Sequence, residues 1–300
     1  MKIAILVLAH AYKSQLLRLV QRLSPDFDVF VHLDKRSALS PADVEVAQNV
    51  RAFKEHRVYW GSYSMILATV SLLKAAARTG SYDRYLLISG QDVPIKDNEA
   101  IAAFFDANRT TEYIEYIRLP NPYWQGGGLD RVSRYHPTST RGAQGTALQL
   151  LKLEHSFFKR LNMVLGERKI DHQFHGGANW FNLTGACVRG ILDYLDANPA
   201  FLSRFKYTVS CDEIFMQTAI HNIGAGDSVV SSCLRYVDWN TGPEYPRILR
   251  TADYQRLVES DMLFARKFDD SVDPDIAEML YTFTSQAGSA AASGVAPVAA

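Results

Sequence analysis

Residues 2–34, KIAILVLAHAYKSQLLRLVQRLSPDFDVFVHLD, carry the pattern that decides the fold. Residues 2–9 are a continuous apolar run, typical of a strand that is buried on both faces. Residues 12–23 place leucine and valine at the spacing of one helix face, and residues 28–33 form a second apolar run. This order predicts a βαβ unit, and with it a parallel sheet covered by helices.

The alternation of strand and helix patterns continues beyond this unit. Residues 58–60 lead into a helical pattern, residues 85–88 form a further strand, and residues 120–145 form a long loop rich in glycine, proline and aromatic residues. A loop of that length is usually functional. We therefore expect one α/β domain over residues 1–285, with a mostly parallel sheet flanked by helices. The low-complexity residues 286–300 are expected to be a disordered tail.

The composition excludes several classes of protein. The 32 Lys and Arg residues balance 32 Asp and Glu residues, so no broad basic surface for nucleic acid is expected. Cys187, Cys211 and Cys233 form no Cys-x-x-Cys pair, which argues against a disulfide framework and a zinc site and favours a reducing compartment.

The hydrophobic runs are too short for a membrane-spanning helix. None approaches about 20 residues, and the apolar start lacks a basic leader region and a small-residue cleavage site. We expect a cytoplasmic protein, with peripheral association at the inner face of a membrane left open.

Three strand ends mark a candidate ligand site. Ligands of open parallel sheets bind outside the carboxyl ends of the strands, which here precede His10, Asp34 and the Gly90-Gln91-Asp92 turn. Asp92 could bind a divalent metal, as an Asp-x-Asp pair does, but residue 90 is glycine and one carboxylate would hold a metal poorly. Alternatively, Asp92 caps the segment before Pro94.

Two charged pairs allow a structural and a functional interpretation. Asp212-Glu213 begins a predicted helix, with Ser210 or Asp212 as its N-cap, and serves either the helix dipole or proton transfer. Arg266-Lys267 is either a solvated face or part of a diphosphate site with upstream arginines. The sequence has no Gly-x-Ser-x-Gly elbow, Walker loop, Gly-x-Gly-x-x-Gly fingerprint or paired-histidine metal motif.

Several motifs occur in a characteristic order. They are His32-Leu33-Asp34-Lys35, Trp60-Gly61-Ser62-Tyr63-Ser64, Ser89-Gly90-Gln91-Asp92-Val93-Pro94, Gly176-Gly177-Ala178-Asn179-Trp180-Phe181, Ser210-Cys211-Asp212-Glu213 and Phe264-Ala265-Arg266-Lys267-Phe268. Together they resemble the core-2/I-branching β-1,6-N-acetylglucosaminyltransferase and peptide O-xylosyltransferase family, glycosyltransferase family 14, as a bacterial-type member. The resemblance covers nearly the whole chain except the tail.

The resemblance implies a GT-A-like α/β domain that binds a UDP-sugar and transfers the sugar with inversion, without a metal ion or other cofactor. It makes Glu213 the catalytic base, in a motif whose proline is Cys211 here. It places Lys267 on the diphosphate, with Arg247 as first and Arg250 as second choice for the companion arginine.

The remaining assignments concern the nucleotide and the two sugars. Asp34 is assigned to uridine, with His10 beside the nucleotide, and Trp239 to the acceptor. The donor and acceptor pocket is further expected to include Gly90, Gln91, Asp92, Trp180, Trp124 and Arg134. The expected partners are a UDP-sugar, with UDP-N-acetylglucosamine slightly ahead of UDP-xylose, and a saccharide acceptor in surface polysaccharide or glycolipid synthesis. A metal-dependent transferase that uses Asp92 and a non-catalytic glycan-binding module are the alternatives.

Overall fold

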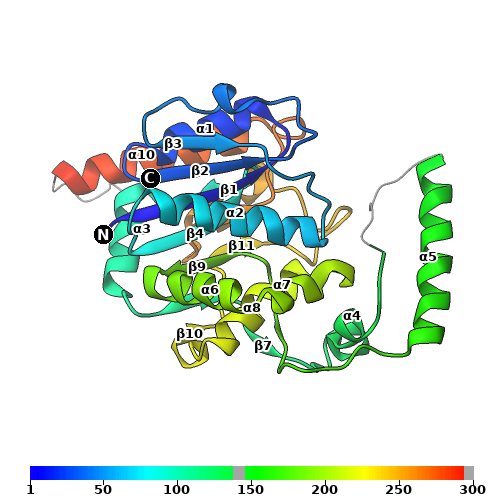
Figure 1. The fold of residues 1–300 in the computed structure, drawn as a ribbon. Coiled ribbons are helices and arrows are strands. Elements are labelled where there is room, and N and C mark those ends of the chain that lie inside the picture. Colours follow the sequence, from blue (N-terminus) through cyan, green and yellow to red (C-terminus); the bar gives the residue numbers. More distant parts are fainter. Residues whose placement is uncertain (138–145, 294–300) are drawn as a thin grey trace. The chain divides into compact units, whose positions relative to one another are not determined.

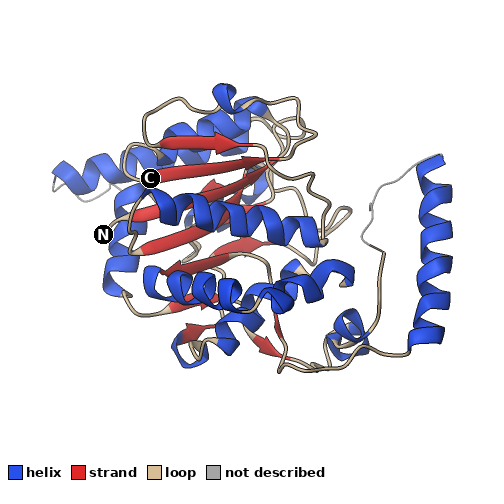
Figure 2. Cartoon of the chain, viewed as in Figure 1, coloured by secondary structure: helices blue, strands red, loops and turns tan. Residues whose placement is uncertain are grey.

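The computed structural model describes residues 1–137 and 146–293, drawn in Figures 1 and 2. The chain divides into two compact units. Unit 1 comprises Met1–Lys54, Gly80–Thr110 and the chain from Leu234 onward, and unit 2 comprises Glu55–Thr79 and Thr111–Cys233. The prediction of one domain over residues 1–285 stays a prediction.

Unit 1 is built on a parallel sheet of four strands in the order β4-β1-β2-β3. The strands are β1 (Ile3–Ala9), β2 (Asp28–Leu33), β3 (Val50–Phe53) and β4 (Arg84–Ser89). In the centre, Leu6 pairs with Phe30 on one side and Leu87 on the other. All three side chains are buried, as expected for apolar strands that helices cover.

The other elements of unit 1 form a smaller layer. Strand β12 (Phe264–Arg266) pairs in parallel with β11 (Arg235–Val237) and antiparallel with β5 (Val93–Pro94). The helices of the unit are α1 (Lys13–Leu23), α3 (Asn98–Ala107), α9 (Tyr254–Val258) and α10 (Asp275–Ser293), with short 3-10 turns at Pro41–Asp43 and Thr251–Asp253. Residues of β5, β12, α9 and α10 share one buried apolar cluster, which fixes the position of Phe268.

Unit 2 contains short strands and most of the long helices. Strand β6 (Glu112–Ile114) pairs with β9 (Phe181–Thr184) and β10 (Val229–Val230), and β7 (Ile117–Arg118) pairs with β8 (His175–Gly176). Its helices are α2 (Tyr63–Thr79), α4 (Asp130–Ser133), α5 (Thr146–Leu165), α6 (Gly185–Ala197), α7 (Pro199–Arg204) and α8 (Asp212–Asn222), with 3-10 turns at Gln125–Gly128, Phe205–Tyr207 and Gly226–Ser228.

An aromatic cluster holds α8 in unit 2. The Phe215 ring on α8 lies 5.7 Å from the ring of Phe201 and 5.4 Å from the ring of Phe205. All three phenylalanines are buried, so α8 is anchored along this face.

The α/β class, with a mostly parallel sheet and flanking helices, is confirmed. Two local predictions need correction. The N-cap of α8 is Cys211, which makes no side-chain cap hydrogen bond, so neither Ser210 nor Asp212 has that role. Helix α10 continues to Ser293 through residues assigned to a disordered tail, because alanine-rich sequence favours a helix. Residues 294–300 of that predicted tail lie outside the described residues.

Candidate functional site

The carboxyl ends of β1, β2 and β4 lie together in unit 1. The backbone N–H of Asp34 donates to the carbonyl of Ala9 at 2.8 Å, and the N–H of Gly90 donates to the carbonyl of Leu8 at 3.0 Å. The three predicted strand-end positions therefore share one edge of the parallel sheet, where such sheets bind ligands.

This edge carries closely spaced charges. Both carboxylate oxygens of the buried Asp34 accept from the Arg36 guanidinium, at 3.1 and 2.7 Å. Burial lowers the pKa of His10; Asp34 opposes this change, whereas the positive charges of Lys267 and Arg36 reinforce it. Lys267 therefore acts electrostatically on the same edge as His10 and Asp34. The contact of Asp34 with uridine stays a prediction. In the structure, the Asp34 carboxylate is bound by Arg36.

A second carboxylate lies close to Lys267. The Tyr12 hydroxyl donates to Asp269 at 2.9 Å. Burial acts to raise the pKa of Asp269, but hydrogen bonds from Ser271 and Tyr12 and the charge of Lys267 outweigh it, so the net change is a lower pKa. Asp269 is therefore held in its ionised form beside the lysine.

The two motifs around Gly90 and Lys267 are bound directly to each other. The N–H of Phe268 donates to the carbonyl of Gln91 at 3.0 Å, and the Gln91 amide donates back to the carbonyl of Phe268 at 3.2 Å. The buried Gln15 amide on α1 donates to the carbonyls of both Gly90 and Phe268 at 3.2 Å. A Cβ at Gly90 would lie 3.3 Å from the Cβ of Ala9. Tight packing therefore fixes the turn that the sequence assigned to the donor pocket.

Asp92 is a buried structural carboxylate. Its side chain is fully buried, accepts from the Ser89 hydroxyl at 2.8 Å and pairs with the equally buried Arg235 at 3.2 Å. Arg266 lies 3.6 Å away on the other carboxylate oxygen. This arrangement agrees with the capping interpretation and extends it, because Asp92 also neutralises two arginines.

Arg247 is engaged by two carboxylates. Its guanidinium binds Asp238 at 2.9 Å and Asp253 at 2.5 Å, and these contacts raise its pKa. The Asp238 carboxylate also accepts hydrogen bonds from backbone N–H groups of the turn after it, at 2.8 and 3.0 Å. These hydrogen bonds hold the turn that carries Trp239 in one conformation. The Trp239 side chain is 57% exposed, which excludes a core role. The Arg250 side chain is exposed.

Glu213 lies in the first turn of α8 in unit 2. Its Oε2 accepts from the Arg131 guanidinium at 2.7 Å, and its side chain is 33% exposed. Arg131 in turn lies over the Trp124 ring, 4.3 Å from the ring centroid. Glu213 is therefore an accessible carboxylate with a fixed orientation, supported by the predicted pocket residue Trp124.

Two glycines let neighbouring backbone approach Glu213. The N–H of Gly177 donates to the Glu213 carbonyl at 2.9 Å. A Cβ at Gly176 would lie 2.6 Å from the Trp124 ring, and one at Gly177 would lie 2.2 Å from the Glu115 carbonyl oxygen. Neither position has room for a side chain. The Gly-Gly motif is thus a packing requirement of the Glu213 surroundings.

The loop before Glu213 contacts another of the predicted motifs. A Cβ at Gly61 would lie 3.4 Å from Ser210, and Gly61 has a positive φ of 67°. Cys211 has a φ of −71°, within the range that proline fixes, so its backbone fits the proline of the family motif. Burial raises the pKa of the Cys211 thiol, which keeps it neutral.

The remaining predicted pocket residues of unit 2 are Arg134 and Trp180. Arg134 forms an exposed pair with Glu167 at 3.7 Å, and Trp180 is half-buried just before β9. The sequence analysis missed Arg131 and Gln15. Gln15 had a signal, a polar residue on the apolar face of α1, whereas Arg131 had none because its partner lies 82 residues away.

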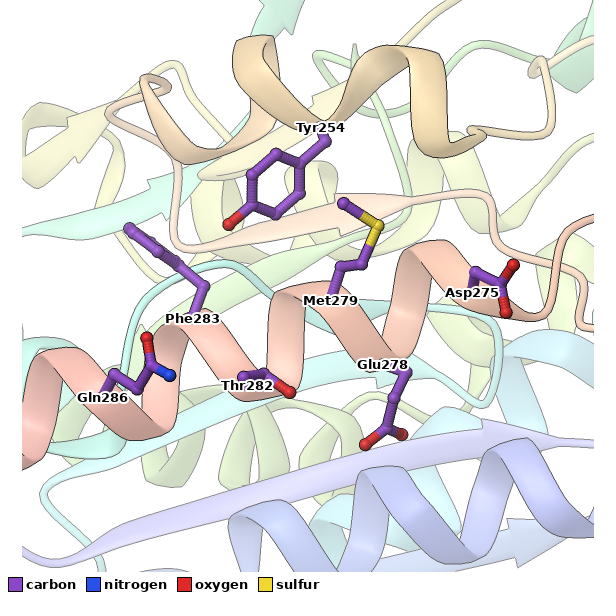
Figure 3. A pocket seen from close by; sticks show the side chains of 7 residues that line it. All are labelled: Tyr254, Asp275, Glu278, Met279, Thr282, Phe283 and Gln286. Carbon is purple, nitrogen blue, oxygen red and sulfur yellow. The ribbon is translucent and has the colours of Figure 1, made fainter. Parts of the chain in front are cut away.

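The described residues contain no group of three or more His, Cys, Asp or Glu side chains that could hold a metal ion. No described helix combines the length and apolar character that crossing a membrane requires. A groove between α9 and α10 in unit 1 is lined by Tyr254, Asp275, Glu278, Met279, Thr282, Phe283 and Gln286, and none of the predicted site residues is among them (Figure 3).

A family model for the Core-2/I-Branching enzyme matches residues 3–262. The chain belongs to the Core-2/I-Branching enzyme family. Its sequence is 28% identical over 308 aligned residues to xylosyltransferase 2 of Rattus norvegicus, and 27% identical over the same length to xylosyltransferase 2 of Homo sapiens. Each alignment covers 93% of this chain and 33% of the relative, so the chain spans about a third of these relatives' length.

This family membership confirms the resemblance found in the sequence. Xylosyltransferase 1 of Pan troglodytes is 23% identical, with coverage of 93% of this chain and 30% of the relative. Among solved structures, the chain is similar to a 2-C-methyl-D-erythritol 4-phosphate cytidylyltransferase from Thermus thermophilus, with 14% sequence identity and a TM-score of 0.37. The alignment covers 77% of this chain and 89% of the cytidylyltransferase chain.

Proposed function

We propose that the chain transfers a sugar from a UDP-sugar to a saccharide hydroxyl, with inversion at the transferred carbon and without a metal ion. The observation that carries this proposal is Glu213, an accessible carboxylate at the start of α8 whose orientation Arg131 fixes at 2.7 Å. Family membership supports the reaction class, because the matching relatives are named xylosyltransferases.

Glu213 would be the general base. In an inverting transfer, one group takes the acceptor proton while the hydroxyl oxygen attacks the sugar carbon opposite the leaving diphosphate. Arg131 contacts Oε2 of Glu213, so we assign Oε1 to the acceptor hydroxyl. The ion pair also limits rotation of the carboxylate, which favours one orientation for proton transfer.

Lys267 would meet the charge that develops on the diphosphate. A leaving diphosphate without a metal ion needs fixed cations. Lys267 lies at the strand-end edge of unit 1 with His10, whose pKa burial lowers, so the imidazole is neutral at pH 7. Because Asp238 and Asp253 engage Arg247, we now rank the exposed Arg250 ahead of it as the companion cation.

The contacts of Asp92 weigh against the metal-dependent alternative. A metal ligand at this position would have to give up contacts with Ser89, Arg235 and Arg266 inside a fully buried pair. The glycan-binding alternative leaves the oriented Glu213 without a role.

A donor screen tests the proposal. UDP, UDP-N-acetylglucosamine and UDP-xylose are each tested by thermal shift, and then for UDP release with a panel of oligosaccharide acceptors, in EDTA and in Mn²⁺. A ligand at 100 times its Kd stabilises the fold by about 2.7 kcal/mol. We expect stabilisation by UDP and release that EDTA does not inhibit. Absence of a shift with UDP would reject the proposal, and transfer that requires Mn²⁺ would restore the metal-dependent alternative.

A further inference from the structure

Helix α5 presents an apolar stripe to solvent. Leu153, Phe157 and Val164 lie on one face at helical spacing, and their side chains are 68%, 60% and 82% exposed. Met163 and Leu165 extend the exposed apolar surface at the end of the helix, which is green in Figure 1. Large exposed apolar patches on a folded domain mark an interaction surface.

The opposite face of α5 is already used for packing. Phe158 is buried, and its ring lies 5.8 Å from the ring of Tyr207. One turn later, the Asn162 side chain accepts from the N–H of Tyr135 and donates to its carbonyl, both at 2.8 Å. The exposed stripe is thus not the face that anchors α5 to unit 2.

Basic residues accompany the stripe. Lys159 and Arg160 are exposed on α5, with Arg160 one helical turn before Val164. The span of α5, residues 146–165, contains three Lys and Arg residues and one Glu residue, although the whole chain has no net charge. The helix that exposes apolar side chains therefore carries a net positive charge.

We propose that α5 binds the surface of an anionic lipid bilayer. Such a helix lies in the bilayer interface, where its apolar side chains enter the headgroup boundary. Arg160, on the stripe itself, extends its charged end to the headgroups, and the neighbouring Lys159 adds a second cation for anionic lipids. A second copy of the chain fits less well, because a two-fold contact through this face would set the same positively charged segment of each copy against the other. This inference goes beyond the proposed transferase activity and does not depend on it.

Vesicle co-sedimentation of the full chain tests this proposal. The vesicles are phosphatidylcholine alone, or phosphatidylcholine mixed with phosphatidylglycerol. We expect binding to the anionic vesicles that falls as salt is raised, and much weaker binding to the neutral ones. Phe157→Ser should lower the partition constant about tenfold or more, since an aromatic side chain no longer enters the bilayer.

Matched variants separate the stripe from general surface effects. Val164→Ser should lower binding to anionic vesicles, whereas Val46→Ser, the same change at a valine that is 46% exposed in unit 1, should leave it unchanged. Arg160→Gln should lower it about fivefold, and Arg78→Gln, at an exposed arginine on α2, should not.

Three results would overturn the proposal. The first is absence of binding to anionic vesicles by the unaltered chain. The second is equal binding by Phe157→Ser, in a variant whose circular dichroism shows the same helix content. The third is a stable dimer in solution that Phe157→Ser separates, because the stripe would then be covered by a second copy of the chain.

Discussion

Replacing Asp92 by asparagine tests whether this carboxylate stabilises the fold or binds a metal. Asp92 and Arg235 are both fully buried, 3.2 Å apart, and Arg266 lies 3.6 Å from the other carboxylate oxygen. The asparagine keeps the size of the side chain but removes the negative charge that faces both guanidinium groups. Removing one partner of a buried pair typically costs about 3–5 kcal/mol. The hydrogen bond with Ser89 can be retained, so we expect about 3 kcal/mol.

The assay is urea unfolding followed by circular dichroism, with Asp106→Asn as the matched control. Asp106 pairs with Arg109 at the surface, where both side chains are about half exposed, so its loss should cost less than about 1 kcal/mol. Transfer activity of Asp92→Asn is measured below its unfolding midpoint, with and without Mn²⁺. A variant as stable as the parent, with activity that Mn²⁺ restores, would refute the structural role of Asp92.

Three further predictions concern other residues. Lys267→Ala should weaken UDP binding by about 1.5–3 kcal/mol, measured by calorimetry, because a charge-assisted phosphate contact is lost; Lys96→Ala, at a lysine two residues beyond β5, should not. Trp239→Ala should raise the acceptor KM and leave UDP affinity unchanged, since the exposed ring is available to stack on a sugar; an unchanged KM would contradict this assignment. Burial and the neighbouring His221 lower the pKa of His175 to about 4, whereas the unfolded imidazole titrates near 6.5. The unfolded state therefore binds more protons between these values, so the free energy of unfolding should fall by about 2–3 kcal/mol as pH drops from 7 to 4, and His175→Gln should reduce that slope.

The parallel sheet was predictable because its signals are local. The apolar runs at residues 2–9 and 28–33 and the helix pattern between them specify a βαβ unit. Strand ends then located His10 and Asp34 on one edge without any knowledge of packing. The boundaries of these three elements agree with the structure within one residue, whereas strand β3 was not predicted.

The partners of the site residues were not predictable in the same way. Asp92 meets Arg235 across 143 residues of sequence, and Glu213 meets Arg131 across 82, and no periodicity records such pairings. The choice between a metal-binding and a structural Asp92 depends on these contacts. The prediction of Ser210 or Asp212 as the N-cap of α8 was wrong for a related reason. The tertiary position of the loop at Cys211 overrides the local preference for a capping side chain.

The role of Glu213 is the central claim, and the kcat of Glu213→Gln tests it most directly. The amide keeps the shape of the side chain but cannot take the acceptor proton. We predict a loss of kcat of about 10²–10⁴, with the Kd for UDP changed by no more than a few-fold. Glu167→Gln, the same change at an exposed residue of unit 2, should retain full activity. If Glu213→Gln keeps most of its kcat, Glu213 is not the base and the proposed mechanism is wrong.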